Sequence, residues 1–454
     1  MSQRWSRRQF LQAMGIAAAG VLAGCAAPTP VAAPEAAALT EEKAPEATVT
    51  ELTWWNAEPG GVMLESHKRV SQDILARFHE QHPGIRVKME FFPEDGFFDK
   101  VTTAIAAGAM ADLWQGFYAT EISRRGFLAE LTPFMERDAV KPEEVWFKIG
   151  QLRASYQGKY YAVPRDGTAA AIVYNQDLFD EFGIAYPEEG WTAADYREIA
   201  IKLTNEEKGT YGLGGNEGSI GALEWGPFSY NLGVDFVSED GHQVKGYLDA
   251  PEAIAAMQWY LDLSAVDKVT TAGTAIAEQF EWFTFLSGKV GMQSISSWEI
   301  PELDESAQFR WGLVAPPRKD EKAEQWAWTD AILYYLWSGS KHKDEGWEFL
   351  KFVSGPEAGK MAAEARVWAP PIPEVWTAVG WDKDATLGVF WKEMQKPTRV
   401  PNYLRSEFQW ECIQPAWDAA WSRYVEEGER PLEAIVQEEV ETAQKCLDEA
   451  YAEA

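Results

Sequence analysis

Strand-like and helix-like patterns alternate along residues 49–114, and this alternation limits the fold more than any other feature of the chain. A β-prone run at 49–55 precedes a segment whose apolar residues recur at helical spacing and which ends at Pro83-Gly84. Residues 85–91 then alternate between apolar and polar, as a half-buried strand does, before a second helical stretch and a short strand at Leu113-Trp114. This β-α-β-α-β order predicts a largely parallel sheet covered by helices, with ligands bound beyond the carboxyl ends of the strands.

The middle of the chain continues in the same style. Residues 160–164 and 170–174 are strand-like, and Thr192 with Asp195 predicts the capping box of a following helix. About 400 residues follow the N-terminal stretch 1–48, which predicts roughly two domains. No later segment is apolar for the length of about 20 residues that a membrane-spanning helix needs.

The N-terminus has the features of an export signal in their usual order. Arg7-Arg8 precedes an apolar stretch at 13–23 that is rich in Ala and Gly and too short to span a membrane. The stretch ends in Leu-Ala-Gly-Cys at 22–25, which resembles the bacterial lipobox. We therefore expect residues 1–24 to be a twin-arginine export signal. Cys25 is then the lipidated first residue of the mature protein and anchors it to the outer face of the cytoplasmic membrane.

The stretch from the lipidated cysteine onward, residues 25–48, is expected to be a flexible tether. Ala, Pro and Glu dominate residues 26–48, and no aromatic residue occurs there. Such a stretch cannot bury enough apolar surface to fold. Its composition predicts a semi-extended linker between the membrane anchor and a folded body.

The charge and the aromatic content of the chain bear on its partners. The chain has 71 acidic and 41 basic residues and a net charge of −30, so nucleic acid, whose binding needs a basic face, is not an expected partner. Most of the 22 Trp, 22 Phe and 16 Tyr residues must be core, because aromatic rings bury large areas. A surplus of Trp also suits sugar recognition, since a flat indole can cover the apolar C–H face of a pyranose.

Two further cysteines, Cys412 and Cys446, follow the lipobox. They are too few for the usual four-cysteine metal site. In an oxidising compartment they could form a disulfide, and they could equally be two separate buried side chains. No metal site and no cofactor is expected.

Seven segments of the body form an ordered series: His79–Val87, Lys100–Gly108 with Ala111–Leu113, Gly126–Pro133, Gly158–Pro164, Tyr174–Phe179, Phe285–Met292 with Trp298, and Ser340–Leu350. In this order they resemble motifs of the family 1 extracellular solute-binding proteins, the sugar-binding components of ABC importers. Ala111 stands where the family usually has Pro, and Gln176 where it usually has Lys. The resemblance covers nearly the whole body after the tether.

The resemblance implies an α/β fold of two lobes, the periplasmic-binding-protein fold, with hinge strands and a ligand cleft between the lobes. It implies crossings near 164–166, 311–314 and 366–370, so the expected lobes are 49–165 with 312–367, and 166–311 with 368–454. The implied function is capture of a sugar or oligosaccharide by hinge closure and delivery to the membrane permease. The protein would act as a monomer and without catalysis.

Nine residues are expected to contact the ligand, from the resemblance and from their places at strand ends, near crossings or among the Trp residues: Trp55, Glu58, Tyr118, Asp166, Trp225, Trp282, Trp298, Trp328 and Arg366. Trp54 and Trp55 point to opposite faces of one strand, and Trp55 is favoured for the cleft. Trp298 follows a run of small residues where family members have an aromatic platform. The alternatives are a hinge salt bridge for Asp166, an ion pair for Arg366 and a core position for each Trp.

The sequence gives little indication of catalysis. The five His residues do not form a His-Glu-x-x-His motif, and the chain has neither a phosphate-binding loop nor Gly-x-Ser-x-Gly. The rival hypothesis is an exported carbohydrate-active enzyme, which would need two carboxylates across a cleft. A third hypothesis keeps the binding fold and changes the ligand to glycerol-phosphate or a polyamine. The sequence does not determine which sugar is bound, its length or its anomer.

Overall fold

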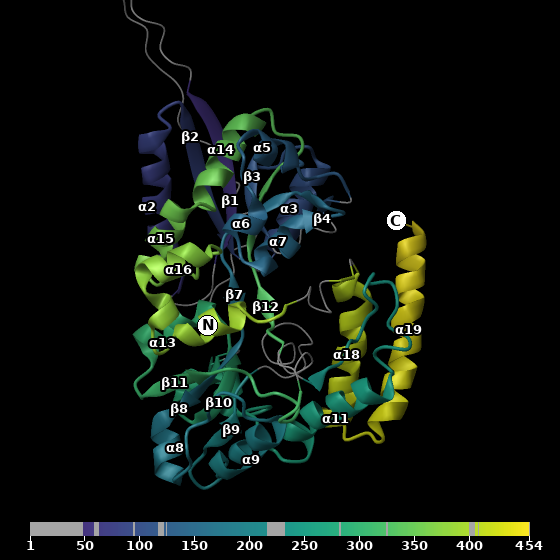
Figure 1. Cartoon of the computed structure of the whole chain (residues 1–454). Helices are drawn as coiled ribbons and strands as arrows, with labels where there is room; N and C mark the ends of the chain where they lie inside the picture. Colours follow the sequence, from purple (N-terminus) through teal and green to yellow (C-terminus); the bar gives the residue numbers. More distant parts are fainter. Residues whose placement is uncertain are drawn as a thin grey trace, which may run out of the picture. The chain divides into compact units, whose positions relative to one another are not determined.

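The chain divides into two units, residues 1–47 and 48–454, and the second unit is the subject of all that follows. The computed structural model describes residues 49–58, 63–93, 96–116, 122–123, 125–215, 232–280, 283–323, 326–398, 405–406 and 408–453. Figure 1 shows the arrangement of their helices and strands. Cys25 and the expected signal and tether lie outside the described residues.

Five strands form the first sheet, in the order β2-β1-β3-β13-β6. β1 (Thr50–Glu58) pairs in parallel with β2 (Ile85–Pro93) and with β3 (Leu113–Gly116). The predicted β-α-β-α-β order is confirmed, with α2 (Met63–Gln81) and α3 (Phe97–Ala106) as the connecting helices. β13 (Leu333–Leu336) enters antiparallel between β3 and β6 (Ala162–Pro164).

Four strands form the second sheet, in the order β11-β8-β10-β9. β10 (Val290–Ile295) runs antiparallel to β8 (Ala171–Asn175) and parallel to β9 (Tyr211–Leu213). β11 (Trp311–Val314) pairs antiparallel with β8, so the expected lobe boundary at 312 falls inside a strand of the second sheet. The chain returns to the first sheet only between β11 and β13.

Two short strands connect the two sheets. β7 (Thr168–Ala169) lies in the chain between β6 and β8, and β12 (Thr329–Asp330) lies between β11 and β13. The two pair antiparallel with each other. They are therefore the crossing strands of the fold.

The remaining elements are mostly helices that pack around the two sheets. The predicted capping box is confirmed at the start of α9, where Thr192 and Asp195 bond to each other's backbone N–H. The elements are α5 (Thr132–Arg137), α6 (Pro142–Val145), α7 (Lys148–Ala154), β4 (Ser155–Tyr156), β5 (Lys159–Tyr160), α8 (Gln176–Phe182), α9 (Ala193–Leu203), α11 (Pro251–Ala265), α12 (Ala275–Phe280), η1 (Thr284–Ser287), η2 (Ser297–Glu299), α13 (Ile300–Ser306), α14 (Lys343–Val353), α15 (Pro356–Glu364), α16 (Pro373–Val379), η3 (Trp381–Lys383), α17 (Gly388–Met394), η5 (Gln409–Ile413), α18 (Gln414–Trp421), η6 (Ser422–Glu426) and α19 (Leu432–Glu453).

The alternation of side chains along the strands divides the buried residues into separate clusters. On β8, Ile172 and Tyr174 belong to one large cluster, whereas Ala171 and Val173 belong to the other. On β1, Trp54 is buried in the cluster of the first sheet, and Trp55 packs at the edge of a third, smaller cluster. The expectation that the two Trp residues face opposite sides of the strand is thus confirmed.

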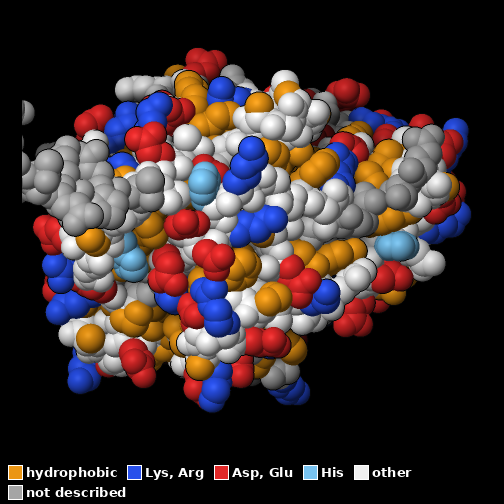
Figure 2. Space-filling view, turned by 90° about the horizontal axis from the view of Figure 1, so that it is seen from above, with side chains coloured by type: hydrophobic (Ala, Val, Ile, Leu, Met, Phe, Trp, Pro, Cys, Tyr) orange, Lys and Arg blue, Asp and Glu red, His pale blue; other side chains and the backbone are white. Residues whose placement is uncertain are grey.

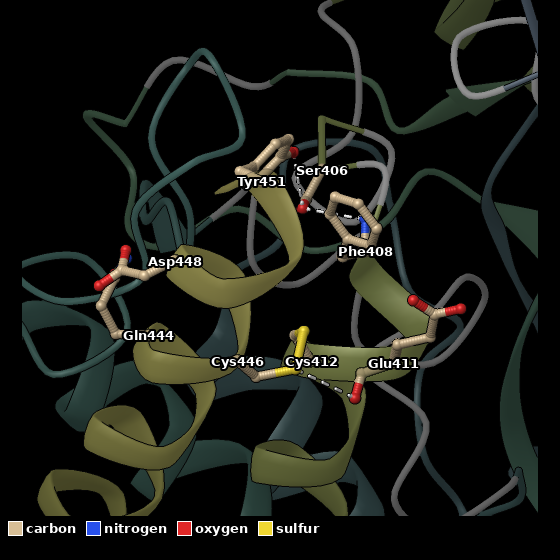
Figure 3. Close-up of a disulfide and its surroundings, with 8 residues drawn as sticks. All are labelled: Ser406, Phe408, Glu411, Cys412, Gln444, Cys446, Asp448 and Tyr451. Atoms are coloured by element: carbon tan, nitrogen blue, oxygen red, sulfur yellow. Dashed lines mark hydrogen bonds between the residues drawn. A yellow bond between two sulfur atoms is a disulfide. The ribbon is translucent and has the colours of Figure 1, made fainter. Parts of the chain in front are cut away.

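The C-terminal helices form a covalently joined unit. α18 and α19 pack side by side (Figure 1), and Cys412 of η5 forms a disulfide with Cys446 of α19 (Figure 3). Both η5 and η6, on either side of α18, are π-helical. Of the two possibilities that the sequence leaves open for these cysteines, the structure has the disulfide.

Candidate ligand-binding site

A buried ion pair lies where the chain leaves the first sheet. The Asp166 side chain is fully buried, and its Oδ2 accepts hydrogen bonds from Nε and Nη2 of Arg165 at 3.1 and 2.6 Å. Its Oδ1 accepts a bond from the backbone N–H of Ile332 at 2.8 Å. A buried carboxylate must have its charge compensated, and these partners within the protein do so. Asp166 therefore forms the hinge salt bridge that was the alternative, in place of the expected ligand contact.

A second buried ion pair lies where the chain returns to the first sheet. Arg153 Nη2 is 2.8 Å from Asp330 Oδ1, and both side chains are almost fully buried. Arg153 also donates to the backbone oxygen of Ala331 from Nε at 3.3 Å and from Nη2 at 3.1 Å. The two ion pairs thus lie next to the two crossing strands, since Asp166 precedes β7 and Asp330 is part of β12.

Trp298 lies beside the crossing strand β7. It belongs to η2, the turn that follows β10, and its neighbour Ser297 bonds to Thr168 Oγ1 of β7 through its backbone N–H at 3.0 Å and its hydroxyl at 2.8 Å. The indole is half-buried and packs against the cluster of the second sheet. Its Nε1 is buried without a hydrogen-bond partner among the described residues. A buried donor of this kind needs an acceptor, and a ligand or a water can supply one.

The two expected ligand residues on β1 already have partners within the protein. Trp55 is half-buried, packs edge-to-face with Phe92 at 5.2 Å between ring centroids, and has Lys100 Nζ 4.6 Å from its ring centroid. The Glu58 carboxylate lies 3.2 Å from Lys68 Nζ and is about 29% exposed. Both residues keep some exposed surface, and no described contact brings them together with Trp298.

Two more of the expected residues have the alternative positions that the sequence left open. Trp328 is 1% exposed and lies in the core of the second sheet, which is the core position that was its alternative. Full burial removes more of the apolar area of an indole from water than a partly exposed position does, and so stabilises the fold more. Arg366 makes its alternative ion pair, with Nε 2.7 Å from Asp304 Oδ2. Tyr118, Trp225 and Trp282 lie outside the described residues.

Two further features of the described residues were missed by sequence reasoning. The Arg153–Asp330 pair joins residues far apart in the chain, and no local signal indicates it. Trp410 is 48% exposed on the π-helical η5, two residues before the disulfide at Cys412. Only the structure reports this exposure. The described residues contain no group of three or more His, Cys, Asp or Glu that could hold a metal ion.

Comparison with known proteins identifies the family. The model of the family described as bacterial extracellular solute-binding protein matches residues 65–360. The chain belongs to this family. Over 421 residues this solute-binding protein is 22% identical to the erythritol/L-threitol-binding protein of Mycolicibacterium smegmatis, a match covering 82% of each chain. Over 383 residues it is 21% identical to the maltotriose-binding protein of Pyrococcus abyssi, covering 81% of this chain and 76% of the relative.

Solved structures share the fold of this solute-binding protein. An ABC substrate-binding protein of Listeria monocytogenes, in complex with cycloalternan, superposes with a TM-score of 0.71 at 21% identity. The match covers 88% of this chain and 99% of that chain. The expected α/β fold of the two-lobe binding proteins is therefore confirmed. Within the described residues no helix is long and apolar enough to cross a membrane.

Proposed function

We propose that this chain is the extracytoplasmic substrate-binding protein of an ABC importer, which captures a sugar or an oligosaccharide and delivers it to the membrane permease. The observation that carries the sugar assignment is Trp298, a half-buried indole beside a crossing strand whose N–H lacks a partner. An indole offers a flat face for the C–H groups of a sugar ring and one donor for a hydroxyl. The names of the relatives above, which bind erythritol, L-threitol or maltotriose, support the same ligand class.

The charges at the crossing strands support an uncharged ligand. Arg165 pairs with Asp166 and Arg153 pairs with Asp330, and all four side chains are buried. Since each charge is compensated within the protein, these groups offer neither a cation for a phosphate nor a carboxylate for a polyamine. A neutral sugar fits this arrangement better than glycerol-phosphate or a polyamine does.

Capture is proposed to occur by closure about the crossing strands. Each of β7 and β12 connects one sheet to the other, so a small change of backbone angles there would rotate one sheet and its helices relative to the other. Ligand would bind first against Trp298, and closure would then bury it. No bond is made or broken in this mechanism.

A thermal-shift screen tests the ligand class. Neutral mono- and oligosaccharides, glycerol-phosphate and polyamines are added separately to the full chain, because a ligand that binds only the native state raises Tm. We expect a rise with one class of neutral sugar, and we expect chromatography to recover that sugar intact. A rise only with the charged solutes would contradict the proposal, and release of shorter sugars would favour the carbohydrate-active enzyme.

The anchoring of the protein is proposed from the sequence alone. Arg7-Arg8 and the lipobox-like residues 22–25 support export followed by lipidation of Cys25. Cys25→Ser is expected to abolish incorporation of labelled fatty acid and to release the protein from the membrane fraction. The matched control is Ala26→Ser, which keeps the cysteine and should stay anchored. Unchanged membrane retention of Cys25→Ser would exclude a lipid anchor at this residue.

A further inference from the structure

A cavity of about 510 Å³ lies at the end of the second sheet that is remote from the crossing strands. Tyr211, the first residue of β9, lines it and is level with Val290, the first residue of β10. β10 runs from there to Ile295, just before Trp298, over five residue steps of about 3.3 Å each, or roughly 17 Å. The cavity is therefore separate from the site proposed for the transported ligand. Its volume lies within the range of about 300–1,000 Å³ that is typical of small-molecule sites.

Three segments form the walls of this cavity, which we term the β9 cavity. They are the turn that leads from α9 into β9, the end of α11 with the loop after it, and the end of α18 with η6. The lining residues are Thr204, Glu206, Thr210, Tyr211, Ser264, Lys268, Thr270, Ala272, Gly273, Thr274, Trp421, Val425 and Glu426. The lining thus combines two aromatic rings with five Ser and Thr hydroxyls and three charged groups.

The hydroxyls of the β9 cavity mostly use their protons in hydrogen bonds within the protein, so they would act mainly as acceptors toward a ligand. Thr204 Oγ1 donates to the backbone oxygen of Ala200, and Thr210 Oγ1 donates to that of Leu203, each at 2.9 Å. Ser264 and Thr270 share a hydrogen bond of 2.9 Å between their hydroxyls. Thr204 Oγ1 also accepts from the backbone N–H of Gly212 at 2.9 Å, and Thr270 Oγ1 from that of Ala272 at 3.4 Å. Because a hydroxyl has one proton and two lone pairs, Thr204 and Thr210 can each still accept a hydrogen bond from a ligand. The carboxylates of Glu206 and Glu426 add further acceptors.

Lys268 supplies a donor at the same cavity. Its side chain is exposed and makes no ion pair with any described residue. Its backbone φ is +53°, in the left-handed region that non-glycine residues rarely adopt. The neighbours on both sides are held in place, since Asp267 Oδ1 accepts from Arg197 Nη2 at 2.9 Å and Val269 is buried. Such a backbone conformation persists only where the surroundings impose it, so the loop holds Lys268 at the cavity.

We propose that the β9 cavity is a second ligand site, which binds a neutral sugar or polyol outside the transport site. The hydroxyls of such a solute would donate to Glu206, Glu426 and the threonines, and one of them would accept from Lys268. The rings of Tyr211 and Trp421 offer apolar surface for its C–H groups. An anionic solute is disfavoured, because two carboxylates face it and only one ammonium does.

Saturation-transfer NMR on the full chain tests this site with glycerol, methyl α-D-glucopyranoside and trehalose as probes. The wild type is compared with Trp298→Ala, which alters the transport site, and with the double variant Glu206→Gln/Lys268→Met. Both substituted positions are exposed, and Lys268→Met keeps an unbranched side chain that is only one heavy atom shorter, so the double variant should melt like the wild type. Lys319→Met, in the neighbouring groove between α9 and α11, is the matched control.

We expect at least one probe to bind the wild type, Trp298→Ala and Lys319→Met alike, and to bind the double variant at least tenfold more weakly. Glucuronate should bind the wild type at least tenfold more weakly than the neutral glucoside. The proposal is overturned if no probe binds Trp298→Ala, if every probe that does so binds the double variant as it binds the wild type, or if glucuronate binds as well as the glucoside. Failure of sugar capture at the transport site would leave these outcomes unchanged.

Discussion

At the scale of the residue, Trp298 and Trp328 show how similar side chains acquire different roles. Trp328 belongs to the cluster of the second sheet, and Trp298 packs against that cluster. Both have an indole N–H without a partner among the described residues. Trp328 is 1% exposed, whereas Trp298 is half-buried at the turn that contacts β7. Only the indole that keeps exposed surface can contact a ligand, so the two residues form a natural pair for mutagenesis.

Trp298→Ala is expected to weaken sugar binding at least tenfold, because truncation of an aromatic side chain at a binding hot spot commonly costs about 2 kcal/mol or more. Trp328→Ala, the core control, is expected to lower the free energy of unfolding by about 3–5 kcal/mol. Titration calorimetry and urea unfolding measure the two quantities. If Trp298→Ala bound sugar normally and lost as much stability as the control, Trp298 would be a core residue.

At the scale of the element, the described contacts show how distant helices are joined. Asp138, at the end of α5, accepts hydrogen bonds from Trp347 Nε1 and Lys351 Nζ of α14 at 2.9 and 2.5 Å. Arg137 Nε adds a third bond at 2.8 Å. The Arg137 guanidinium, with Lys351 and Trp347, holds the pKa of the Asp138 carboxyl well below its ordinary value. The ionised form of Asp138 therefore stabilises the packing of α5 against α14.

The depressed pKa of Asp138 predicts a pH dependence of stability. A carboxyl whose folded-state pKa is below its unfolded value of about 3.9 stabilises the fold above that pH, and the contribution is lost as the pH falls through the folded value. Asp138→Asn should lower Tm at pH 7 and pH 5 alike, and the difference from wild type should shrink below about pH 4. Asp344→Asn, at the exposed partner of Arg137, is the control with a small effect. A constant difference down to pH 2 would contradict this.

The disulfide between η5 and α19 should contribute strongly to the stability of the C-terminal helices. Cys412 and Cys446 are 34 residues apart, and closing a loop of that length stabilises a fold by about 3–4 kcal/mol through the entropy of the unfolded chain. The double variant Cys412→Ser/Cys446→Ser is expected to unfold at a lower urea concentration. Dithiothreitol should lower the wild-type midpoint in the same way and leave that of the double variant unchanged. Equal midpoints of oxidised and reduced wild type would be evidence against this contribution.

At the scale of the whole molecule, the fold consists of two sheets joined by the crossing strands β7 and β12, with a buried ion pair beside each strand. Acidic and basic side chains are interspersed over the face shown in Figure 2. The buried pairs are expected to survive closure because their charges stay compensated. Motion is therefore expected in the short crossing strands, while each sheet with its helices moves as a body.

Closure is tested by X-ray scattering in solution. The sugar found in the thermal-shift screen is expected to decrease the radius of gyration of the wild type. Trp298→Ala at the same sugar concentration is the control and should keep the radius of the free protein. Identical curves for the free and the saturated wild type would rule out closure on binding.

Much of the fold could be predicted because its signals are local. The alternation of apolar and polar residues at 85–91, the capping box at Thr192 and the opposite faces of Trp54 and Trp55 each depend on near neighbours in the chain. The motif series also identified the family. The candidate site was harder to predict from the sequence. Trp54 and Trp328 are buried in the structure and Trp298 is half-buried, and nothing near Trp328 in the sequence distinguishes it from Trp298.

The sequence by itself determined the α/β class, the order of the first strands and helices, and the family. Only the tertiary structure decided which sheet contains β11, that Cys412 pairs with Cys446, and that Asp166 is a buried hinge residue. Asp166 shows the physical reason. Its partner Arg165 is adjacent in the chain, but its burial and its bond to Ile332, 166 residues away, depend on the crossing strands coming together. Periodicity is set by neighbours along the chain, whereas burial and pairing are set by neighbours in space.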